Sequence, residues 1–362
     1  MTNKTKVLHV TSVHIHTDTR ILLKECKSLS KIYDVHLINP FYEGKIDNIN
    51  LHKVIFFRNR LLRVLTSWLL VLPKSCFSNY KVIHFHDPEL LFAVPIWKIF
   101  GKKIIYDVHE NYSKQVYTKE YIPLVMRKLL QQVIKFIEYI YAYFVDIIIV
   151  VHQDLNFILN KFKKHITISN APILDYKFVP KTRKKQFCYI GVISEERGIL
   201  KMAKIFNELK VDFVLAGNFS SKKLKKKIIS LKNIKYLGII NREEVIKVIS
   251  ESTCGVCTYL PLPNHMISNP NKLFEYLNYG TPVICSNFES YKDIIDEKYS
   301  FVHYVDVNNK SEIVKNIKNI LSMNDNELNN SGEEANKFIE KNYNWDIEAN
   351  KLIESYKKIL SK

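Results

Sequence analysis

The strongest constraint on the fold is an alternation of short apolar runs with amphipathic helical patterns, which occurs twice along the chain. The first series begins with KVLHVTS at residues 6–12, and the second begins with FCYIGVI at residues 187–193, after the basic segment 179–186. Strands that alternate with helices through short connections form parallel sheets covered on both faces. We therefore predict an α/β protein with two tandem, doubly wound Rossmann-like domains.

The chain length of 362 residues favours two hydrophobic cores over one. We expect an N-terminal domain at residues 1–175, a second domain at 185–340, and a C-terminal helix at 341–362 that packs back toward the first domain. Ligands bind at the carboxyl ends of the strands in such sheets, so the two domains are expected to face an interdomain cleft.

The individual elements follow from the spacing of apolar residues. Strands are predicted at residues 6–12, 33–40, 52–57, 81–86, 103–108, 146–151, 187–193, 211–218, 234–240, 254–260, 281–286 and 301–305. Helices are predicted at residues 18–31, 61–72, 89–100, 123–144, 198–210, 241–252, 270–280 and, as the last group, 310–361.

The formal net charge of +18 favours a polyanionic partner, such as a nucleic acid, an anionic membrane or a phosphorylated ligand. A general abundance of lysine would explain the charge equally well. Most aromatic residues lie in apolar runs and not beside basic ones, so we expect no nucleic-acid partner. The sequence contains neither G-x-G-x-x-G after the first strand nor G-x-x-x-x-G-K-[ST], which disfavours a nicotinamide enzyme and a P-loop NTPase.

The six cysteines are scattered, and the N-terminus lacks the apolar stretch of a secretory signal, so we expect a cytoplasmic protein. Cys254 and Cys257 form a C-x-x-C pattern, but strand alternation would send them to opposite faces. Two apolar stretches are not expected to span a membrane. Residues 61–73 are too few, and residues 133–151 contain three charged side chains.

In the second half, Gly191 ends a strand and Arg197 precedes a helix. A glycine there lets the backbone approach a ligand, and the arginine adds a cation to the helix amides. A helix starting after Pro270 would direct the amides of Asn271, Lys272 and Leu273 toward a phosphate or diphosphate, with Ser268 and Asn269 as possible caps. Glu275, one turn further, suits neutral hydroxyl groups, which a carboxylate binds through charge-assisted hydrogen bonds.

Four polar clusters follow strands of the first half and are expected to line one rim of its sheet. They contain His14, His16 and Asp18; His84, His86 and Asp87; His109 and Glu110; and His152, Gln153 and Asp154. Metal binding by the second cluster is conceivable, but alternation places only His84 and His86 on one face. A polar cleft without metal is the favoured interpretation, and for each histidine a structural hydrogen bond is an equal alternative.

Five motifs, taken in order, resemble those of retaining glycosyltransferases of family 4, which have the GT-B fold. They are HVTSVHIHTDTRILLKECKSL, HFHDPELL, IIYDVHENY, YIGVISEERGI and NPNKLFEYLNYGTPVICSN. The resemblance covers nearly the whole chain and is greatest for the branch that builds bacterial surface polysaccharides, such as capsule, O-antigen or lipopolysaccharide. It implies an acceptor-binding first domain, a nucleotide-sugar-binding second domain and no obligatory metal or other cofactor.

The resemblance also implies roles for single residues. Arg197 matches the basic residue that binds the donor diphosphate, and Glu275 matches the second glutamate of the family's E-x7-E pattern, which usually holds the ribose. His109 matches the histidine near the transferred sugar, and Gly191 with the helix start at 270–273 corresponds to backbone contacts with the donor. His109 and Arg197 are thus the expected catalytic residues.

The sequence departs from the family pattern in three places. Ile267 stands where the first glutamate is expected, Val192 replaces a frequent basic residue, and His14 and His16 occupy the loop that often has two glycines. The missing sugar contact would fall to Asn264, His265 or Asn269. These departures weaken the donor assignment more than the fold assignment.

The implied reaction moves a sugar from a UDP- or GDP-sugar to a hydroxyl of a glycan or a lipid-diphosphate-linked acceptor, with retention. The leaving phosphate would accept the acceptor's proton, so no side-chain base is required; an inverting enzyme would use His109, Asp87, Asp18 or Glu110. His14, His16, Asp18, Asp87 and Glu110 are the acceptor-side candidates. A sugar-nucleotide epimerase of the same architecture and a non-catalytic sugar-nucleotide-binding module are the alternatives.

A membrane surface is a further expected partner, at the inner face of the plasma membrane. Arg58, Arg60 and Arg63 precede an apolar helical pattern, and Arg127 and Lys128 lie beside an aromatic one. Such segments can rest on anionic lipid. A core helix with a solvated basic edge explains the same pattern equally well.

Overall fold

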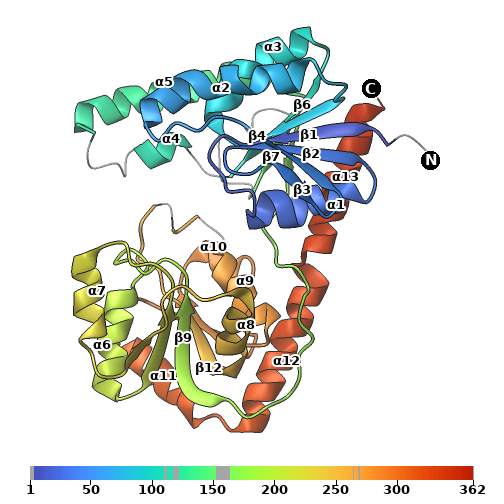
Figure 1. Cartoon of the computed structure of the whole chain (residues 1–362). Coiled ribbons are helices and arrows are strands. Elements are labelled where there is room, and N and C mark those ends of the chain that lie inside the picture. The colour runs from blue at the N-terminus through green and yellow to red at the C-terminus, as the bar shows by residue number, and fades with distance from the viewer. Residues whose placement is uncertain are drawn as a thin grey trace. The chain divides into compact units, whose positions relative to one another are not determined.

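The computed structural model describes residues 4–109, 112–116, 122–151, 164–263, 265–267 and 270–361, without the side chains of residues 114 and 115. The chain divides into two compact units, of which the first contains Met1–Asn170 and Trp345–Lys362 and the second contains Ala171–Asn344. Each unit has its own α/β sheet with helices on both faces (Figure 1). The observed division falls earlier than the expected boundary at residue 175, and the terminal segment joins the first unit from Trp345 onward.

The first unit contains an eight-stranded sheet in the order β3-β4-β2-β1-β5-β6-β7-β8. All pairings are parallel except the antiparallel pairing of β3 with β4. The strands are β1 (Lys6–Val10), β2 (Asp34–Asn39), β3 (Gly44–Ile46), β4 (Ile49–Lys53), β5 (Val82–Phe85), β6 (Lys103–Val108), β7 (Ile147–Val150) and β8 (His165–Thr167).

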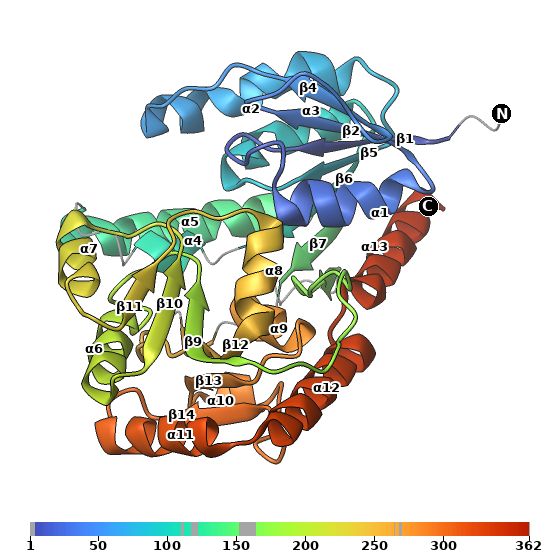
Figure 2. The ribbon, with the colours of Figure 1, turned by 60° about the horizontal axis from the view of Figure 1, so that its bottom comes forward.

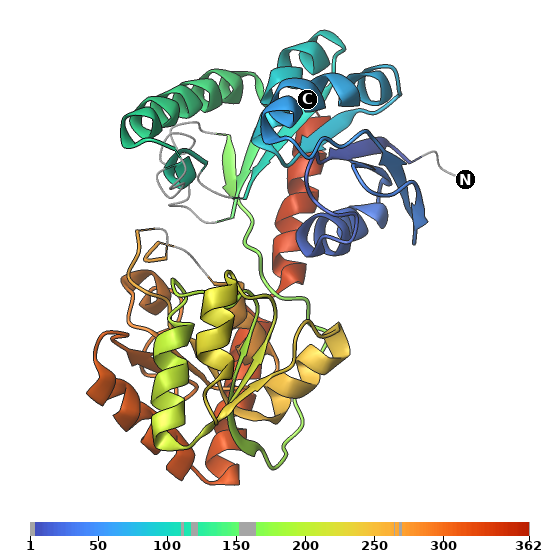
Figure 3. The ribbon, with the colours of Figure 1, turned by 60° about the vertical axis from the view of Figure 1, so that its left-hand side comes forward.

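Two groups of helices cover this sheet. The first group packs on the face formed by residues such as Leu8, Phe85 and Tyr106. It comprises α2 (Arg60–Cys76), the 3-10 helix η2 (Pro88–Ala93), α3 (Val94–Ile99) and α5 (Leu124–Phe144). On the other side, the π-helix η1 (Thr19–Cys26) continues into α1 (Lys27–Ser30), and α13 (Trp345–Leu360) packs against both (Figure 3). The short α4 (Tyr112–Gln115) contacts α5.

The second unit contains a six-stranded parallel sheet in the order β11-β10-β9-β12-β13-β14, of which β9, β10 and β11 are seen side by side in Figure 2. The strands are β9 (Lys184–Ile190), β10 (Asp212–Ala216), β11 (Ile234–Tyr236), β12 (Ser252–Cys257), β13 (Val283–Ser286) and β14 (Val302–Val305). One core lies under α6 (Ile199–Leu209), α7 (Lys222–Ile229) and α11 (Lys310–Ser322). The opposite core lies under α8 (Arg242–Glu251), α9 (Asn271–Asn278), α10 (Glu289–Lys292) and α12 (Asp325–Asn342).

The structure confirms a smaller expectation about the cysteines. Cys254 belongs to one core of the second unit and Cys257 to the opposite core, so their side chains point to opposite faces of β12. All six cysteines are buried and unbridged. Among the described helices, none combines the length and the apolar character needed to cross a bilayer.

Candidate functional site

In the second unit, Gly191 and Lys272 meet at the carboxyl end of β9. Gly191 has a φ of 134°, which favours glycine, and a Cβ atom there would lie 2.5 Å from the Cε and Nζ atoms of Lys272. The lysine Nζ lies 5.2 Å from the centroid of the Tyr189 ring. The absence of a side chain at Gly191 therefore lets the Lys272 ammonium lie directly over the strand end.

Arg197 joins the same cluster from the turn before α6. Its Nη1 donates a hydrogen bond to the Tyr189 hydroxyl at 3.2 Å and lies 3.8 Å from the position that a Cβ of Gly191 would occupy. Its guanidinium carbon lies 5.7 Å from the centroid of the Tyr259 ring. The structure thus brings together Gly191, Arg197 and Lys272, as the sequence indicated, and gives the strand end two positive charges.

The two cations are close enough to affect each other. Burial and then the charge of Arg197 lower the pKa of Lys272 to about 8. Without a bound anion, a fraction of Lys272 is therefore neutral in mildly alkaline solution. A diphosphate would favour the charged form, because opposite charges attract.

This pKa gives a pH prediction. Lys272 is protonated below about pH 8, so the affinity for a nucleoside diphosphate should be highest below that value and should fall as the pH rises through it. One coupled proton limits the fall to about tenfold per pH unit. Calorimetric titration with UDP and GDP between about pH 7 and 9.5 measures it, and Lys272→Met should lose this slope because it has no proton to release. An alkaline slope that survives in Lys272→Met would contradict the assignment.

Helix α9 corrects one expectation about backbone donors. Its N-cap is Pro270, and no described side chain caps it. The Leu273 amide donates to the Pro270 carbonyl at 3.0 Å, and the Leu273 side chain is fully buried. Leu273 is therefore not an open donor to a ligand, and the helix start leaves Asn271 and Lys272 for that role. Ser268 and Asn269, the expected caps, and Asn264 lie outside the described residues.

Glu275 is held by a residue that the sequence did not indicate. Arg242 Nη1 donates to Glu275 Oε1 at 2.9 Å, and Arg242 Nη2 donates to Asp175 Oδ2 at 3.1 Å. Tyr279 donates its hydroxyl to the other oxygen of Asp175 at 3.2 Å. Glu275 therefore keeps one oxygen, Oε2, for another donor. The capping motif NREE was the only sequence signal near Arg242, and it indicates a helix start, not a site.

In the first unit, His109 is oriented by a buried carboxylate. Its Nε2 lies 2.7 Å from Oδ2 of Asp107, whose carboxylate also accepts two hydrogen bonds from Arg20, both at 2.9 Å. Burial alone would raise the pKa of Asp107, but the charges of Arg20 and His109 outweigh it and hold the pKa well below its usual range. Asp107 is thus ionised and holds His109 in one orientation.

Three acceptor-side candidates meet beside His109. The rings of His14 and His109 have centroids 5.4 Å apart, and His14 approaches Asp18 at 3.2 Å and Asp87 at 3.5 Å. Burial would lower the pKa of His14, but the hydrogen bond with Asp18 and the charges of Asp87, Asp18 and Asp107 outweigh it and raise the pKa.

Both aspartates in this group also have structural roles. Asp18 caps η1 by accepting hydrogen bonds from the amides of Arg20 and Ile21. Asp87 accepts hydrogen bonds from the Thr11 hydroxyl and the Ser12 amide, both at 2.7 Å. These contacts fix the two carboxylates in place beside His14.

The expected rim of polar side chains is only partly observed. His16 stacks on Tyr42, with ring centroids 4.8 Å apart. His84 and His86 are fully buried, so the prediction that they line a rim is wrong. They project inward because β5 is a central strand, and helices cover both faces of its sheet. Glu110, His152, Gln153 and Asp154 lie outside the described residues.

Two groups of side chains in the first unit could hold a metal ion. One contains His86, Asp107 and His109, and the other contains His9, Glu25, His84 and His86. In the first group, the direct hydrogen bond between His109 and Asp107 already uses the facing atoms. The second group is fully buried. Neither His9 nor Glu25 was identified from the sequence, because only the pairing of β1 with β5 brings His9 opposite His84.

Comparisons with known proteins indicate the enzyme class and the fold. Residues 173–345 match the protein family described as "Glycosyl transferases group 1". The matched residues cover almost all of the second unit, Ala171–Asn344. The chain is accordingly a glycosyltransferase by enzyme class, and the cluster of Gly191, Arg197 and Lys272 lies inside the matched region. The sequence matches none of the curated proteins with which it was compared.

Solved structures of glycosyltransferases share the fold over nearly the whole chain. Sucrose-phosphate synthase from Thermosynechococcus elongatus has a TM-score of 0.75 at 11% identity, with 99% of this chain and 100% of that chain covered. HepE of Anabaena in complex with UDP-glucose has a TM-score of 0.73 at 10% identity, with 98% and 99% covered. A glycosyltransferase from Rickettsia africae has a TM-score of 0.69 at 15% identity, with 99% of each chain covered. These similarities confirm the predicted α/β fold with two Rossmann-like units.

Proposed function

We propose that this glycosyltransferase moves a sugar from a UDP- or GDP-sugar to a hydroxyl group of a glycan or lipid-linked acceptor, with retention at the anomeric carbon. The observation that carries the proposal is the convergence of Gly191, Arg197 and Lys272 at the end of β9, inside the matched domain. HepE, which shares the fold, was solved in complex with UDP-glucose, and this supports the same class of donor.

The chemistry of transfer follows from where charge develops. As the bond to the sugar breaks, negative charge grows on the leaving diphosphate, and fixed cations stabilise it most at that moment. Arg197 and Lys272 supply those cations, and the amides of Asn271 and Lys272 add the favourable end of a helix dipole. Glu275 Oε2 would accept from the ribose hydroxyls, while Arg242 fixes the other oxygen.

In this proposal, the acceptor binds beside the polar side chains that surround His109 in the first unit. His14, Asp18, Asp87 and His109 offer acceptors and donors to sugar hydroxyls, and Asp107 holds His109 in place. Two parts of the proposal rest on the family resemblance: the retention of configuration, and the position of His109 near the transferred sugar. No side-chain base is then required, since the leaving phosphate accepts the acceptor's proton.

Acceptor dependence tests the reaction class. The full chain is incubated with UDP- and GDP-sugars, with and without an extract of lipid-linked glycans, and nucleoside diphosphate release is measured. Release that requires the extract, with the sugar recovered on the lipid fraction, is the expected result. An epimerase would form an epimerised or free sugar without acceptor. Donor binding with no turnover on any extract would indicate a non-catalytic binding module, so either outcome would reject the proposal.

A second proposal concerns the place of action, at an anionic membrane and in surface-polysaccharide synthesis. Helix α5 exposes an apolar stripe, spaced by three or four residues, that occupies one face of the helix. The stripe contains Val125, Leu129, Val133, Phe136, Ile140 and Tyr143. Lys128 and Lys135 flank it, and α2 exposes Leu61, Leu65 and Leu69. An apolar stripe bordered by lysines along one edge suits the boundary of an anionic bilayer.

Vesicle sedimentation tests the membrane proposal. The chain should bind vesicles that contain phosphatidylglycerol and should bind phosphatidylcholine vesicles much less. Phe136→Asp, whose side chain is 65% exposed, should weaken binding by at least about tenfold, because a charge opposes insertion. Ile239→Asp, in the second unit and 75% exposed, is the matched control and should bind as wild type. Equal binding by both variants, or none by wild type, would reject the membrane role.

A further inference from the structure

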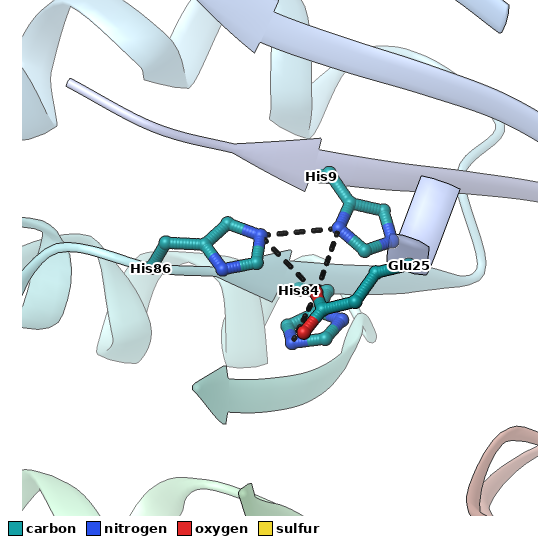
Figure 4. Close-up of side chains that lie close together, drawn as sticks. All are labelled: His9, Glu25, His84 and His86. Carbon is teal, nitrogen blue, oxygen red and sulfur yellow. Dashed lines mark hydrogen bonds and ion pairs between the residues drawn. The ribbon is translucent and has the colours of Figure 1, made fainter. Parts of the chain in front are cut away.

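Four fully buried side chains of the first unit direct polar atoms toward one point (Figure 4). His9 comes from β1, His84 from β5, His86 from the residue after β5, and Glu25 from η1. One donor atom from each lies within 4.8 Å of every other. We name these four residues the His-Glu cluster.

Four of the six spacings between the donor atoms are near those of a tetrahedral ion. His9 Nδ1 and His86 Nε2 are 3.1 Å apart. Oε2 of Glu25 lies 3.9 Å from His9 Nδ1, 3.9 Å from His84 Nε2 and 4.0 Å from His86 Nε2. A zinc ion with bonds of about 2.0–2.1 Å sets its tetrahedral donors about 3.3 Å apart. Inward shifts of a few tenths of an ångström would complete that geometry.

The hydrogen bonds around the cluster show that it is incomplete without a further atom. His86 Nδ1 lies 3.3 Å from both Asp107 Oδ2 and His109 Nε2. Because Asp107 can only accept and His109 Nε2 donates to it, we assign the His86 proton to Nδ1 and a lone pair to its Nε2. His9 Nδ1 then donates to His86 Nε2, His9 Nε2 accepts from the Tyr356 hydroxyl at 3.2 Å, and that hydroxyl accepts from His84 Nδ1 at 3.0 Å. This chain of hydrogen bonds leaves His84 Nε2 with a lone pair that accepts no hydrogen bond.

The bare lone pair faces an equally unsatisfied carboxylate. His84 Nε2 and both oxygens of Glu25 are buried without a hydrogen-bond partner. Arg20 Nε approaches Oε1 of Glu25 at 3.1 Å, which leaves Oε2 directed at the imidazoles. Buried polar atoms of this kind normally have a partner, and an ion or a water is the usual explanation. A water would donate to His84 Nε2 and Glu25 Oε2 but would leave the other imidazoles unchanged.

We propose that the His-Glu cluster binds a zinc ion through His9 Nδ1, His84 Nε2, His86 Nε2 and Glu25 Oε2. Three imidazoles and one carboxylate suit zinc better than magnesium or calcium, which prefer oxygen donors. Binding requires that Glu25 be ionised and that His9 change tautomer, so that its Nε2 donates to the Tyr356 hydroxyl. All three imidazoles then donate their second N–H, two to Tyr356 and one to Asp107, as metal-bound histidines usually do.

The charges of neighbouring groups agree with a bound cation. Glu25 and Asp107 are both fully buried and share a single guanidinium, that of Arg20. Burial and the charge of Asp107 raise the pKa of Glu25, and a divalent ion beside it would favour the ionised form, because opposite charges attract. Four protein donors fill a tetrahedral ion, so the site is structural and leaves no position for a substrate. It would tie β1, β5 and η1 together behind the Asp107–His109 pair, and α13 through Tyr356.

Metal analysis of the full chain tests the proposal. Protein produced in zinc-supplemented medium and purified without chelator should contain one zinc ion per chain. Cobalt-substituted protein should show the intense visible absorption of a four-coordinate site. Wild-type protein that contains no zinc and takes up none on refolding with the metal would overturn the proposal. The cluster would then hold a buried water or only the hydrogen bonds between its own side chains.

Variants locate the ion. Glu25→Gln and His84→Gln nearly preserve shape, and each should lower zinc affinity by at least about tenfold. His303→Gln, which changes a largely buried histidine of the second unit with an unpartnered Nε2, is the matched control and should keep the zinc. Zinc retained by both cluster variants would mean adventitious surface binding and would overturn the proposal. If both variants fail to fold, anomalous diffraction from wild-type crystals at the zinc edge tests the proposal instead. We expect an anomalous peak among the four donor atoms, and the absence of such a peak would contradict the proposal.

Discussion

Replacing Arg20 by glutamine should lower the free energy of unfolding of the first unit by about 3–5 kcal/mol, because it leaves buried carboxylates without their cation. Arg20 is 5% exposed, donates two hydrogen bonds to Asp107 and lies 3.1 Å from Glu25. Its Nη1 also donates to the Ile168 carbonyl at 3.2 Å. The π-helical winding of η1 contributes, since its hydrogen bonds join residues five apart and Arg20 and Glu25 have that spacing.

Tryptophan fluorescence during urea unfolding measures the change in the free energy of unfolding of the first unit. The chain has three tryptophans, Trp68, Trp97 and Trp345, and all belong to the first unit. Lys27→Gln is the control, since Lys27 pairs with Asp47 on the surface at 3.2 Å and its loss should cost about 0–1 kcal/mol. Equal losses for the two variants would contradict the assigned role of Arg20.

The second large effect concerns turnover. Arg197→Gln should lower kcat by about 10²–10³-fold, because a fixed cation stabilises the leaving diphosphate mainly in the transition state. The variant loses the hydrogen bond to the Tyr189 hydroxyl, which contributes about 0.5–1.5 kcal/mol, so folding should change little. Initial rates of nucleoside diphosphate release at saturating donor and acceptor measure the effect.

Lys201→Gln is the matched control for this prediction. Lys201 lies on α6 close to Arg197 in sequence, but its Nζ donates to Asn308 at 2.6 Å, away from the cluster of Gly191 and Lys272. Its kcat should equal that of wild type. Near-normal turnover of Arg197→Gln, or an equal loss in Lys201→Gln, would remove Arg197 from the diphosphate site.

The sequence predicted most of the fold where apolar periodicity was clear. The expected strand at 103–108 matches β6, and the helix at 123–144 matches α5 within one residue. The sequence KKLKKKII gave too weak a signal for α7, because only Leu224 and Ile228 are buried there. The predicted strand at 234–240 ends early, at Tyr236 in β11. The π-helical form of η1 depends on tertiary contacts of Arg20 and Glu25, which no local pattern reports.

The two candidate sites differed in how far they could be predicted. Gly191 and Arg197 follow β9 in sequence, and Lys272 begins a helix, so the cluster of these three residues follows from local signals and sheet topology. The contact of Arg242 with Glu275 joins elements that only the tertiary fold brings together. The same is true of Tyr356, which is 272 residues from its partner His84. Side chains that meet across the interior therefore required the structure.

The most direct test of the donor site is a crystal structure of the full chain with a nucleoside diphosphate. The diphosphate should lie over Gly191, within hydrogen-bonding distance of Arg197 and Lys272, with the ribose hydroxyls at Oε2 of Glu275. A diphosphate bound elsewhere on the chain, or bound at this strand end without contact to either cation, would contradict the proposed mechanism of sugar transfer.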